Sequence, residues 1–306
     1  MRGEGELLLV STYELGHSPQ GIASPAAFLA RAGFRPAGLD LAVERLDPAR
    51  VARARLVAFS VPMHTALRLA LDAAARIRAL NPLAVLAFHG LYAPLHAPLL
   101  LEAGARAVLG GECEERLVEL ARSVEANAPL DAFVQRAGPE ASLDRLDFPV
   151  PRRDLLPPPE RYARLREPDG RERAAGYLEA TRGCLHHCRH CPIPAVYGGR
   201  LFAVPVDVVV ADAAAQVARG ATHLTFGDPD FLNGPSHALR IARALHARFP
   251  SVTFDFTAKV EHLVRHAALL PELAACGAVL VTSAVESLSD RVLAKLAKGH
   301  EREDVF

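Results

Sequence analysis

The chain has 306 residues, which is long enough for two domains of about 150 residues each. Half of its residues are hydrophobic and 23% are charged, so the composition supports packed cores and excludes wholesale disorder. Lys and Arg total 35, as do Asp and Glu, and this balance argues against a nucleic-acid partner bound through a general basic surface. Without a signal-peptide apolar region or about 18 consecutive apolar residues, the sequence predicts a cytoplasmic protein with no membrane span.

From Leu7 to about Ala126, short apolar runs alternate with amphipathic stretches, which predicts a parallel sheet covered by helices. The expected strands are Leu7–Val10, Gly38–Leu41, Leu56–Val61, Ala84–Phe88 and Ala107–Leu109. The expected helices are Pro25–Ala32, Thr65–Leu80, Ala93–Ala103 and Glu114–Glu125. We therefore expect an α/β, doubly wound, Rossmann-like domain over residues 1–126, with its ligand crevice at the carboxyl ends of the strands.

Residues 127–175 have a different character, because prolines interrupt any regular pattern and charged residues fill the remainder. We predict that this segment is a Pro-rich linker between two domains.

The alternation resumes in residues 176–306. The expected strands are Gly176–Thr181, His223–Phe226, Thr253–Phe256 and Val279–Ser283. The expected helices are Asp207–Ala218, Ser236–Phe249, Val260–Cys276 and Ser289–Lys298. Four successive βα units without a long antiparallel hairpin predict a partial (β/α) barrel, whose active site would lie at the carboxyl ends of the strands.

Three of the five cysteines, Cys184, Cys188 and Cys191, lie within eight residues in a CxxxCxxC pattern. Such a crowded group indicates a metal or redox site rather than a disulfide scaffold. Three thiolates in a loop can wrap a metal cluster and leave one coordination position open for chemistry. The alternative is a structural zinc site completed by His186, His187 or His190. The position directly after a barrel strand favours the open cluster.

With this motif at this place, the chain resembles the radical S-adenosylmethionine (SAM) superfamily. The resemblance implies that Cys184, Cys188 and Cys191 hold a 4Fe-4S cluster whose fourth iron chelates the amino and carboxylate groups of SAM. It also implies reductive cleavage of the sulfonium to give a 5′-deoxyadenosyl radical. The radical would then modify a substrate that the sequence does not identify.

The resemblance extends to seven further positions, which it implies are cofactor-binding: His190, Gly227, Asp228, Asp230, Lys259, Glu286 and Ser287. His190 takes the place of an aromatic residue near the adenine. The stretch from Gly227 to Phe231 takes the place of the glycine-glycine-glutamate motif that binds the methionine amino group, although it departs from that consensus. Lys259 and Glu286 are strand-end residues suited to a carboxylate and to the ribose diol.

The order of an open α/β domain followed by a barrel resembles the cobalamin-dependent radical SAM class, so cobalamin is a further expected ligand. His64 and His89, at predicted strand ends, are either cobalamin neighbours or ordinary loop histidines. The Asp-x-His-x-x-Gly signature of other cobalamin proteins is absent.

A closer resemblance is to a bacterial radical SAM group named for a Cys-Cys-Ala-Glu-Pro or selenocysteine-containing carboxyl-terminal tail. It rests on the stretches Ser11–Gly16, Pro62–Thr65, Gly90–Pro94 and Thr257–His262. A related enzyme type transfers the 3-amino-3-carboxypropyl part of SAM, so the resemblance implies either this reaction or methyl transfer. The chain stops at Phe306 after four predicted strands where the superfamily usually builds six, so we expect a truncated barrel.

Three alternatives remain open. The cysteines could belong to a non-catalytic zinc-binding, iron–sulfur-binding or redox-sensing protein. His262 and His266, four residues apart, are either a metal pair or part of a solvated helix face. Cys113 and Cys276 are interpreted as structural thiols.

The expected partners are a small-molecule substrate and a reductant such as flavodoxin or ferredoxin.

Overall fold

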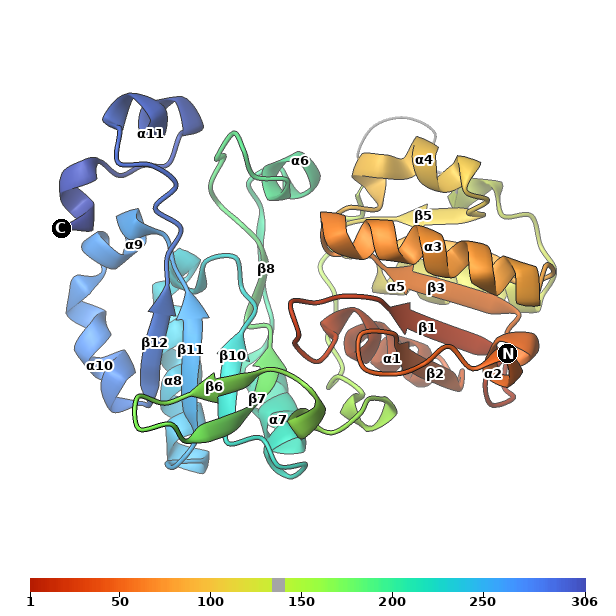
Figure 1. Ribbon diagram of the computed structural model, residues 1–306, viewed down its shortest axis with the longest axis horizontal. Coiled ribbons are helices and arrows are strands. Elements are labelled where there is room, and N and C mark those ends of the chain that lie inside the picture. Colours follow the sequence, from red (N-terminus) through yellow and green to blue (C-terminus); the bar gives the residue numbers. More distant parts are fainter. Residues whose placement is uncertain (134–140) are drawn as a thin grey trace. The chain divides into compact units, whose positions relative to one another are not determined.

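Two sheets built mainly of parallel strands form the framework of the computed structural model (Figure 1). The structure describes residues 1–133 and 141–306, which divide into two units, Met1–Pro157 and Pro158–Phe306. The division falls inside the segment predicted to be a linker, and residues 134–140 of that segment lie outside the described residues. Within the described part of the chain, no helix is both long and apolar enough to cross a membrane.

The sheet of the first unit has five parallel strands in the order β2-β1-β3-β4-β5. The strands are β1 (Leu7–Ser11), β2 (Pro36–Asp40), β3 (Leu56–Ser60), β4 (Val85–His89) and β5 (Ala107–Leu109). The helices are α1 (Gln20–Arg31), α2 (Pro48–Arg53), α3 (His64–Leu80), α4 (Ala97–Glu102) and α5 (Glu114–Glu125). This strand order is a doubly wound one, so the expected fold class of the first unit is confirmed.

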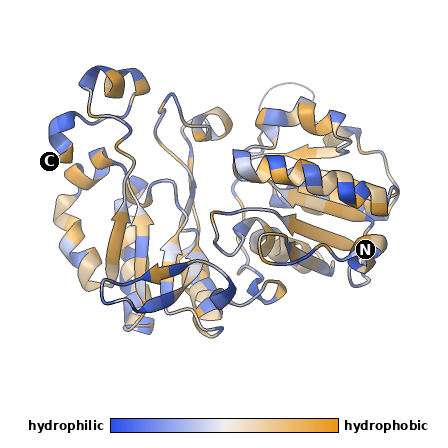
Figure 2. Cartoon of the chain, viewed as in Figure 1, coloured by the Kyte–Doolittle hydropathy of each residue, from blue (hydrophilic) through white to orange (hydrophobic). Residues whose placement is uncertain are grey.

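Both faces of this sheet are buried, which explains why its strands are apolar throughout (Figure 2). Leu8 and Val10 of β1 belong to a core that also includes residues of α2, α3 and α4. Leu7 and Leu9, which alternate with them, are equally buried and lie on the opposite face. Helices α1 and α5 pack against each other, and Ser24 of α1 donates a hydrogen bond to Glu114 of α5 over 2.8 Å.

The described residues from 141 to 157 pack onto the first unit instead of forming a free connector. The Arg152 backbone N–H donates to the carbonyl of Ala23 over 2.9 Å, and the Phe148 ring meets the edge of Phe28 at 6.3 Å between centroids. Arg153 is buried and its guanidinium donates to Gln20. Apolar side chains set between the prolines therefore anchor this segment.

The sheet of the second unit has the order β12-β11-β10-β7-β6. Its strands are β6 (Arg164–Arg166), β7 (Glu172–Leu178), β10 (His223–Phe226), β11 (Thr253–Thr257) and β12 (Ala278–Thr282). A two-stranded sheet is formed by β8 (Thr181–Gly183) and β9 (Leu201–Ala203). The helices are α6 (Ile193–Tyr197), α7 (Val206–Val217), α8 (Pro235–Arg248), α9 (Val260–Arg265), α10 (Leu270–Ala275) and α11 (Asp290–Leu296).

Strands β7, β10, β11 and β12 are parallel, and they form the expected part-barrel. Four phenylalanines around β10 and β11 form its aromatic core, with ring centroids 4.4–6.4 Å apart: Phe226, Phe231, Phe254 and Phe256. Strand β12 lies at the edge of the sheet, and most of its side chains are exposed. The side chain of Val279, for example, is 53% exposed.

The sequence prediction was wrong in three local details of this unit. Strand β6 pairs antiparallel with β7, and β8 pairs antiparallel with β9; only a long antiparallel hairpin was excluded, and neither of these three-residue pairings was expected. The single helix expected over Val260–Cys276 is broken after Arg265 and restarts as α10. The helical conformation ends at His266, which has a φ of −113° and a ψ of +24°, and Pro271 lies in the first turn of α10, where its missing N–H is tolerated.

Candidate functional site

The three clustered cysteines lie in the loop between β8 and β9. Strand β8 ends at Gly183, directly before Cys184, and β9 begins at Leu201. Gly183 has a φ of +75°, and a Cβ there would overlap the carbonyl of Arg200 and the Tyr197 ring, so this position needs glycine. The antiparallel pairing of β8 with β9 therefore holds both ends of the cysteine loop together.

The three thiols face one another closely enough to interact electrostatically. Cys184 and Cys188 are buried and Cys191 is half-buried, and all are free thiols. Burial raises the pKa of the Cys191 thiol, and the neighbouring Cys184 and Cys188 add to this effect. Bound metal would offset this repulsion, because the thiolate is the form that ligates.

The three thiols do not all converge on one point. Zn–S bonds of about 2.3 Å in a tetrahedral site place sulfurs about 3.8 Å apart. Among the described residues, the one group of three or more potential ligands whose atoms all lie within 4.8 Å is His186, Asp230 and His262, which contains no cysteine. At least two of the three sulfurs therefore lie more than 4.8 Å apart, and three cysteines in one loop are the ligand type that iron–sulfur clusters use.

Gly227 and Asp228 support the base of the cysteine loop. Asp228 follows β10 by two residues and is buried, and its carboxyl accepts from the Ala180 backbone N–H over 2.9 Å and from the Thr181 hydroxyl over 2.6 Å. Burial raises the pKa of Asp228 to about 7. A Cβ on Gly227 would overlap the Tyr177 ring. These two predicted cofactor residues thus join the end of β10 to the start of β8.

Lys259, the N-cap residue of α9, reaches the cysteine loop. Its Nζ lies 2.9 Å from Nδ1 of His186 and 3.0 Å from Oε2 of Glu261. His186 and Glu261 are mostly buried, and burial together with the nearby Lys259 lowers the pKa of His186. The ammonium of Lys259 is therefore held at the carboxyl end of β11, where the sequence predicted a cofactor contact.

The predicted cofactor residues His190 and Glu286 are also brought together. Nε2 of His190 lies 3.2 Å from Oε1 of Glu286, and Nζ of Lys298 lies 3.4 Å from the same oxygen. Glu286 has a φ of +68°, an unusual conformation for a residue with a side chain. Ser287 accepts a hydrogen bond from the Ser289 backbone N–H over 3.1 Å.

Asp230 and His262 take positions that sequence reasoning did not foresee. Oδ1 of Asp230 accepts from the Leu232 backbone N–H over 3.1 Å, and Oδ2 lies 2.7 Å from Nδ1 of His262. His262 is buried and faces His186, with 3.1 Å between their Nε2 atoms, while its ring lies 5.6 Å from that of His266. The sequence paired His262 with His266 by helical spacing. It could not show that a loop 76 residues away supplies the nearer histidine.

In the first unit, the carboxyl end of β4 carries a buried histidine. His89 is 3% exposed, and burial lowers its pKa to about 4, so the imidazole is neutral near pH 7. His64, the first residue of α3, is exposed. Cys113 and Cys276 are buried cysteines beside α5 and α10.

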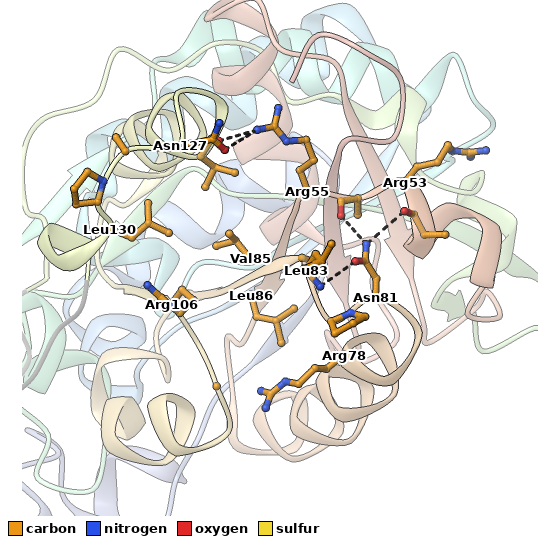
Figure 3. A pocket seen from close by; sticks show the side chains of 18 of the residues that line it. Arg53, Arg55, Arg78, Asn81, Leu83, Val85, Leu86, Arg106, Asn127 and Leu130 are labelled. Carbon is orange, nitrogen blue, oxygen red and sulfur yellow. Dashed lines mark hydrogen bonds between the residues drawn. The ribbon is translucent and has the colours of Figure 1, made fainter.

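A cavity of about 800 Å³ in the first unit lies at the amino edge of the sheet, before β3, β4 and β5 (Figure 3). Four arginines line it: Arg53, Arg55, Arg78 and Arg106. Arg55 donates to the Val124 carbonyl over 3.0 Å. This edge is opposite to the carboxyl ends at which a doubly wound fold binds its ligand, so the cavity does not mark the predicted crevice.

Comparison with known protein families finds similarity in the second unit. Residues 178–306 match the radical SAM superfamily. A stretch of 50 residues is 42% identical to the ribosomal protein uS12 methylthiotransferase RimO of Oleidesulfovibrio alaskensis, and it amounts to 16% of this chain and 11% of RimO.

Two solved structures of TsrM, a radical SAM methyltransferase from Kitasatospora setae, share the fold. The one with a tryptophan substrate and the SAM analog aza-SAM bound has a TM-score of 0.68 at 20% identity, and the match covers 98% of this chain and 64% of that chain. The one with cobalamin and a [4Fe-4S] cluster bound has a TM-score of 0.69 at 19% identity, with 98% and 66% covered. The chain therefore spans less than two thirds of either TsrM structure and about one tenth of RimO. The expected fold class, a Rossmann-like α/β domain followed by a part-barrel, is confirmed.

Proposed function

We propose that the chain is an enzyme that cleaves SAM reductively and uses the resulting radical to modify a small molecule, because residues 178–306 match the radical SAM superfamily. The observation that carries this proposal is the three-thiol loop, which provides three sulfur ligands and no fourth. When bound there, a 4Fe-4S cluster supplies the electron for SAM cleavage and one open coordination position. The radical SAM match also favours this function over a non-catalytic metal-binding or redox-sensing role.

The residues of the chain then have separate tasks. Cys184, Cys188 and Cys191 hold the cluster, and the buried Asn233 donates a hydrogen bond to the sulfur of Cys184 over 3.3 Å. Asp228 fixes the segment that leads into the loop through its contacts to Ala180 and Thr181. Rigid support of this kind keeps the open coordination position fixed relative to the bound substrate.

We propose that SAM lies along the carboxyl ends of β10, β11 and β12. The ammonium of Lys259 suits the methionine carboxylate, and we propose that the segment of Gly227 and Asp228 faces the methionine amino group. Glu286 and Ser287 can hydrogen-bond a ribose diol, and His190, which contacts Glu286, lies on the adenine side. Lys259 is nearly buried, which strengthens its interaction with an anion.

Methyl transfer through cobalamin is the reaction we propose first, because the likeness to the methyltransferase TsrM extends over 98% of the chain and includes the first unit. Transfer of the 3-amino-3-carboxypropyl group is the second. Either reaction needs a one-electron donor, for which we propose flavodoxin or ferredoxin.

The test is anaerobic reconstitution of the full chain with iron, sulfide and cobalamin, followed by dithionite, SAM and chromatography of the nucleoside products. We expect 5′-deoxyadenosine from the wild type and none from Cys184→Ala, whereas Cys276→Ala, a buried cysteine outside the loop, should retain the activity. S-adenosylhomocysteine formed in addition would indicate methyl transfer, and methylthioadenosine would indicate 3-amino-3-carboxypropyl transfer. Nucleoside formation that is equal in wild type and Cys184→Ala would contradict the proposal.

A further inference from the structure

Three side chains from separate segments of the second unit converge beside the cysteine loop. His186 comes from that loop, Asp230 follows β10, and His262 lies in α9, after β11. One ligand atom from each lies within 4.8 Å of the others. We propose that His186, Asp230 and His262 form a binding site for one divalent transition-metal ion, separate from the site of the three cysteine thiols.

The distances between these atoms suit ligands that share one ion. Nδ1 of His262 lies 2.7 Å from Oδ2 of Asp230, Nε2 of His186 lies 3.8 Å from the same oxygen, and one ligand atom from each of the three residues lies within 4.8 Å of the others. Metal–ligand bonds of about 2.0–2.2 Å require ligand atoms about 3–3.5 Å apart. The observed separations bracket this range, so small side-chain rotations are sufficient to complete the site.

Two of the atoms are buried without a hydrogen bond to account for them. The side chains of Asp230 and His262 are 1% and 7% exposed. In the described structure, neither Oδ2 of Asp230 nor Nδ1 of His262 has a hydrogen-bond partner, and the two atoms, 2.7 Å apart, form an ion pair only when His262 is protonated. A buried carboxylate oxygen and a buried ring nitrogen that converge without a hydrogen bond are stabilised if both coordinate a cation.

The side chains are also held in place. Oδ1 of Asp230 accepts from the Leu232 N–H over 3.1 Å, which directs Oδ2 toward His262. The His262 backbone N–H bonds to the carbonyl of Lys259 over 3.0 Å, at the start of α9. A site built on such fixed elements loses little conformational entropy when the ion binds.

Two imidazoles and one carboxylate select the class of ion. This donor set suits Zn²⁺, Fe²⁺ and similar first-row divalent ions, and three protein ligands leave positions open for water or a substrate atom. In this role Asp230 is a metal ligand rather than the predicted ligand of the SAM amino group.

Metal binding would also change the contacts of Lys259. At present Nζ of Lys259 donates to the lone pair on Nδ1 of His186. An imidazole that binds a metal through Nε2 carries its proton on Nδ1, so Lys259 must move away from this nitrogen. Oε2 of Glu261, 3.8 Å from Nδ1, is then the nearest acceptor, and a carboxylate partner of this kind orients metal-bound histidines.

The experiment uses the full chain with its cluster reconstituted, stripped of loosely bound ions on a chelating resin and equilibrated with Zn²⁺. Zinc and iron are measured separately by mass spectrometry. We expect about one zinc per chain in addition to the iron, with at least about tenfold weaker zinc binding in Asp230→Asn and His262→Gln. The matched control is His266→Gln, which changes the neighbouring histidine and should bind zinc like the wild type.

Zinc binding unchanged in Asp230→Asn and His262→Gln would overturn the proposal, as would equal loss in His266→Gln. If the two variants fail to fold, X-ray absorption at the zinc edge of the wild type identifies the atoms bound to zinc and so tests the proposed ligands. A shell of nitrogen and oxygen atoms supports the site, and a shell containing sulfur overturns it, because the zinc would then occupy the cysteine site. Iron content reports the cluster independently, so failure of the proposed enzymatic function and failure of this metal site are distinguishable.

Discussion

Asn233 donates a hydrogen bond from Nδ2 to Sγ of Cys184 over 3.3 Å, and its Oδ1 accepts from the Leu185 N–H over 3.4 Å. One buried side chain, from the short 3-10 helix after β10, thus contacts both a thiol of the loop and the adjacent backbone. Hydrogen bonds to cluster sulfurs are among the features that set reduction potentials, because they stabilise the more negative, reduced state.

The first prediction concerns this bond. Asn233→Ala should make the reduction potential of the bound cluster more negative, since the donor to Cys184 is lost. Asn233→Asp, of the same size, replaces the donor with a negative charge and should lower the potential further. Redox titration followed by electron paramagnetic resonance measures both shifts, and equal potentials in all three proteins would show that Asn233 does not act on the cluster.

The second prediction concerns Lys259. Lys259→Ala should weaken SAM binding by about ten- to a hundredfold, the value of a charge-assisted hydrogen bond. Equilibrium dialysis of the reconstituted protein with labelled SAM measures the dissociation constant. Lys295→Ala, which changes an exposed lysine of α11, is the control and should bind like the wild type. Equal affinity in the Lys259 variant would remove this residue from the SAM site.

The third prediction concerns pH. Burial lowers the pKa of His89 to about 4 from its ordinary value of 6.5. Between these two values the unfolded chain binds more protons than the folded one, so stability is complete above pH 6.5 and falls as the pH falls toward 4. The loss should be about 3 kcal/mol.

Chemical denaturation followed by circular dichroism at pH 7 and pH 4.5 measures this loss. In His89→Leu the decrease should be smaller, because the titrating group is absent. His64→Gln, which changes an exposed histidine of the same unit, should retain the wild-type dependence. If His89→Leu and wild type lose the same free energy of unfolding, His89 is not the group responsible.

The fourth prediction compares two glycines that flank Asp230. Gly227→Ala should destabilise the fold by about 1–3 kcal/mol, because the new Cβ overlaps the Tyr177 ring. Gly234→Ala meets its first neighbour at an ordinary 3.6 Å and should cost less. Thermal unfolding of both variants measures the difference, and similar transition temperatures would be inconsistent with tight packing at Gly227.

The sequence predicted the helices and strands that have a clear hydrophobic pattern within their own residues. Both sheets were expected, and β5, α5 and β10 match the expected residues, because burial of one helix face or of a whole strand leaves a clear hydrophobic pattern. The six-residue α2 and the hairpin of β8 and β9 were missed, since short elements carry little pattern and their pairing depends on distant residues.

The candidate site was also predictable from the sequence only where its residues lie close together along the chain. The cysteine spacing indicated the cluster loop because its three residues lie in one short segment. The pairing of His190 with Glu286, and of His186 with Asp230 and His262, depends on how separate strand ends meet, so spacing alone could not predict it. For His262, helical spacing pointed to His266, whereas tertiary packing provided His186.

The central claim is that three thiols hold a cluster with one open iron. The most direct test is to determine the iron, sulfide and zinc content of the anaerobically reconstituted chain, then to record the electron paramagnetic resonance spectrum of the reduced protein with and without SAM. We predict about four irons and four sulfides per chain and a spectrum that changes when SAM is added. The account would be contradicted if the chain took up no iron and bound zinc through the three cysteines. It would also be contradicted if the spectrum of the cluster did not change when SAM was added.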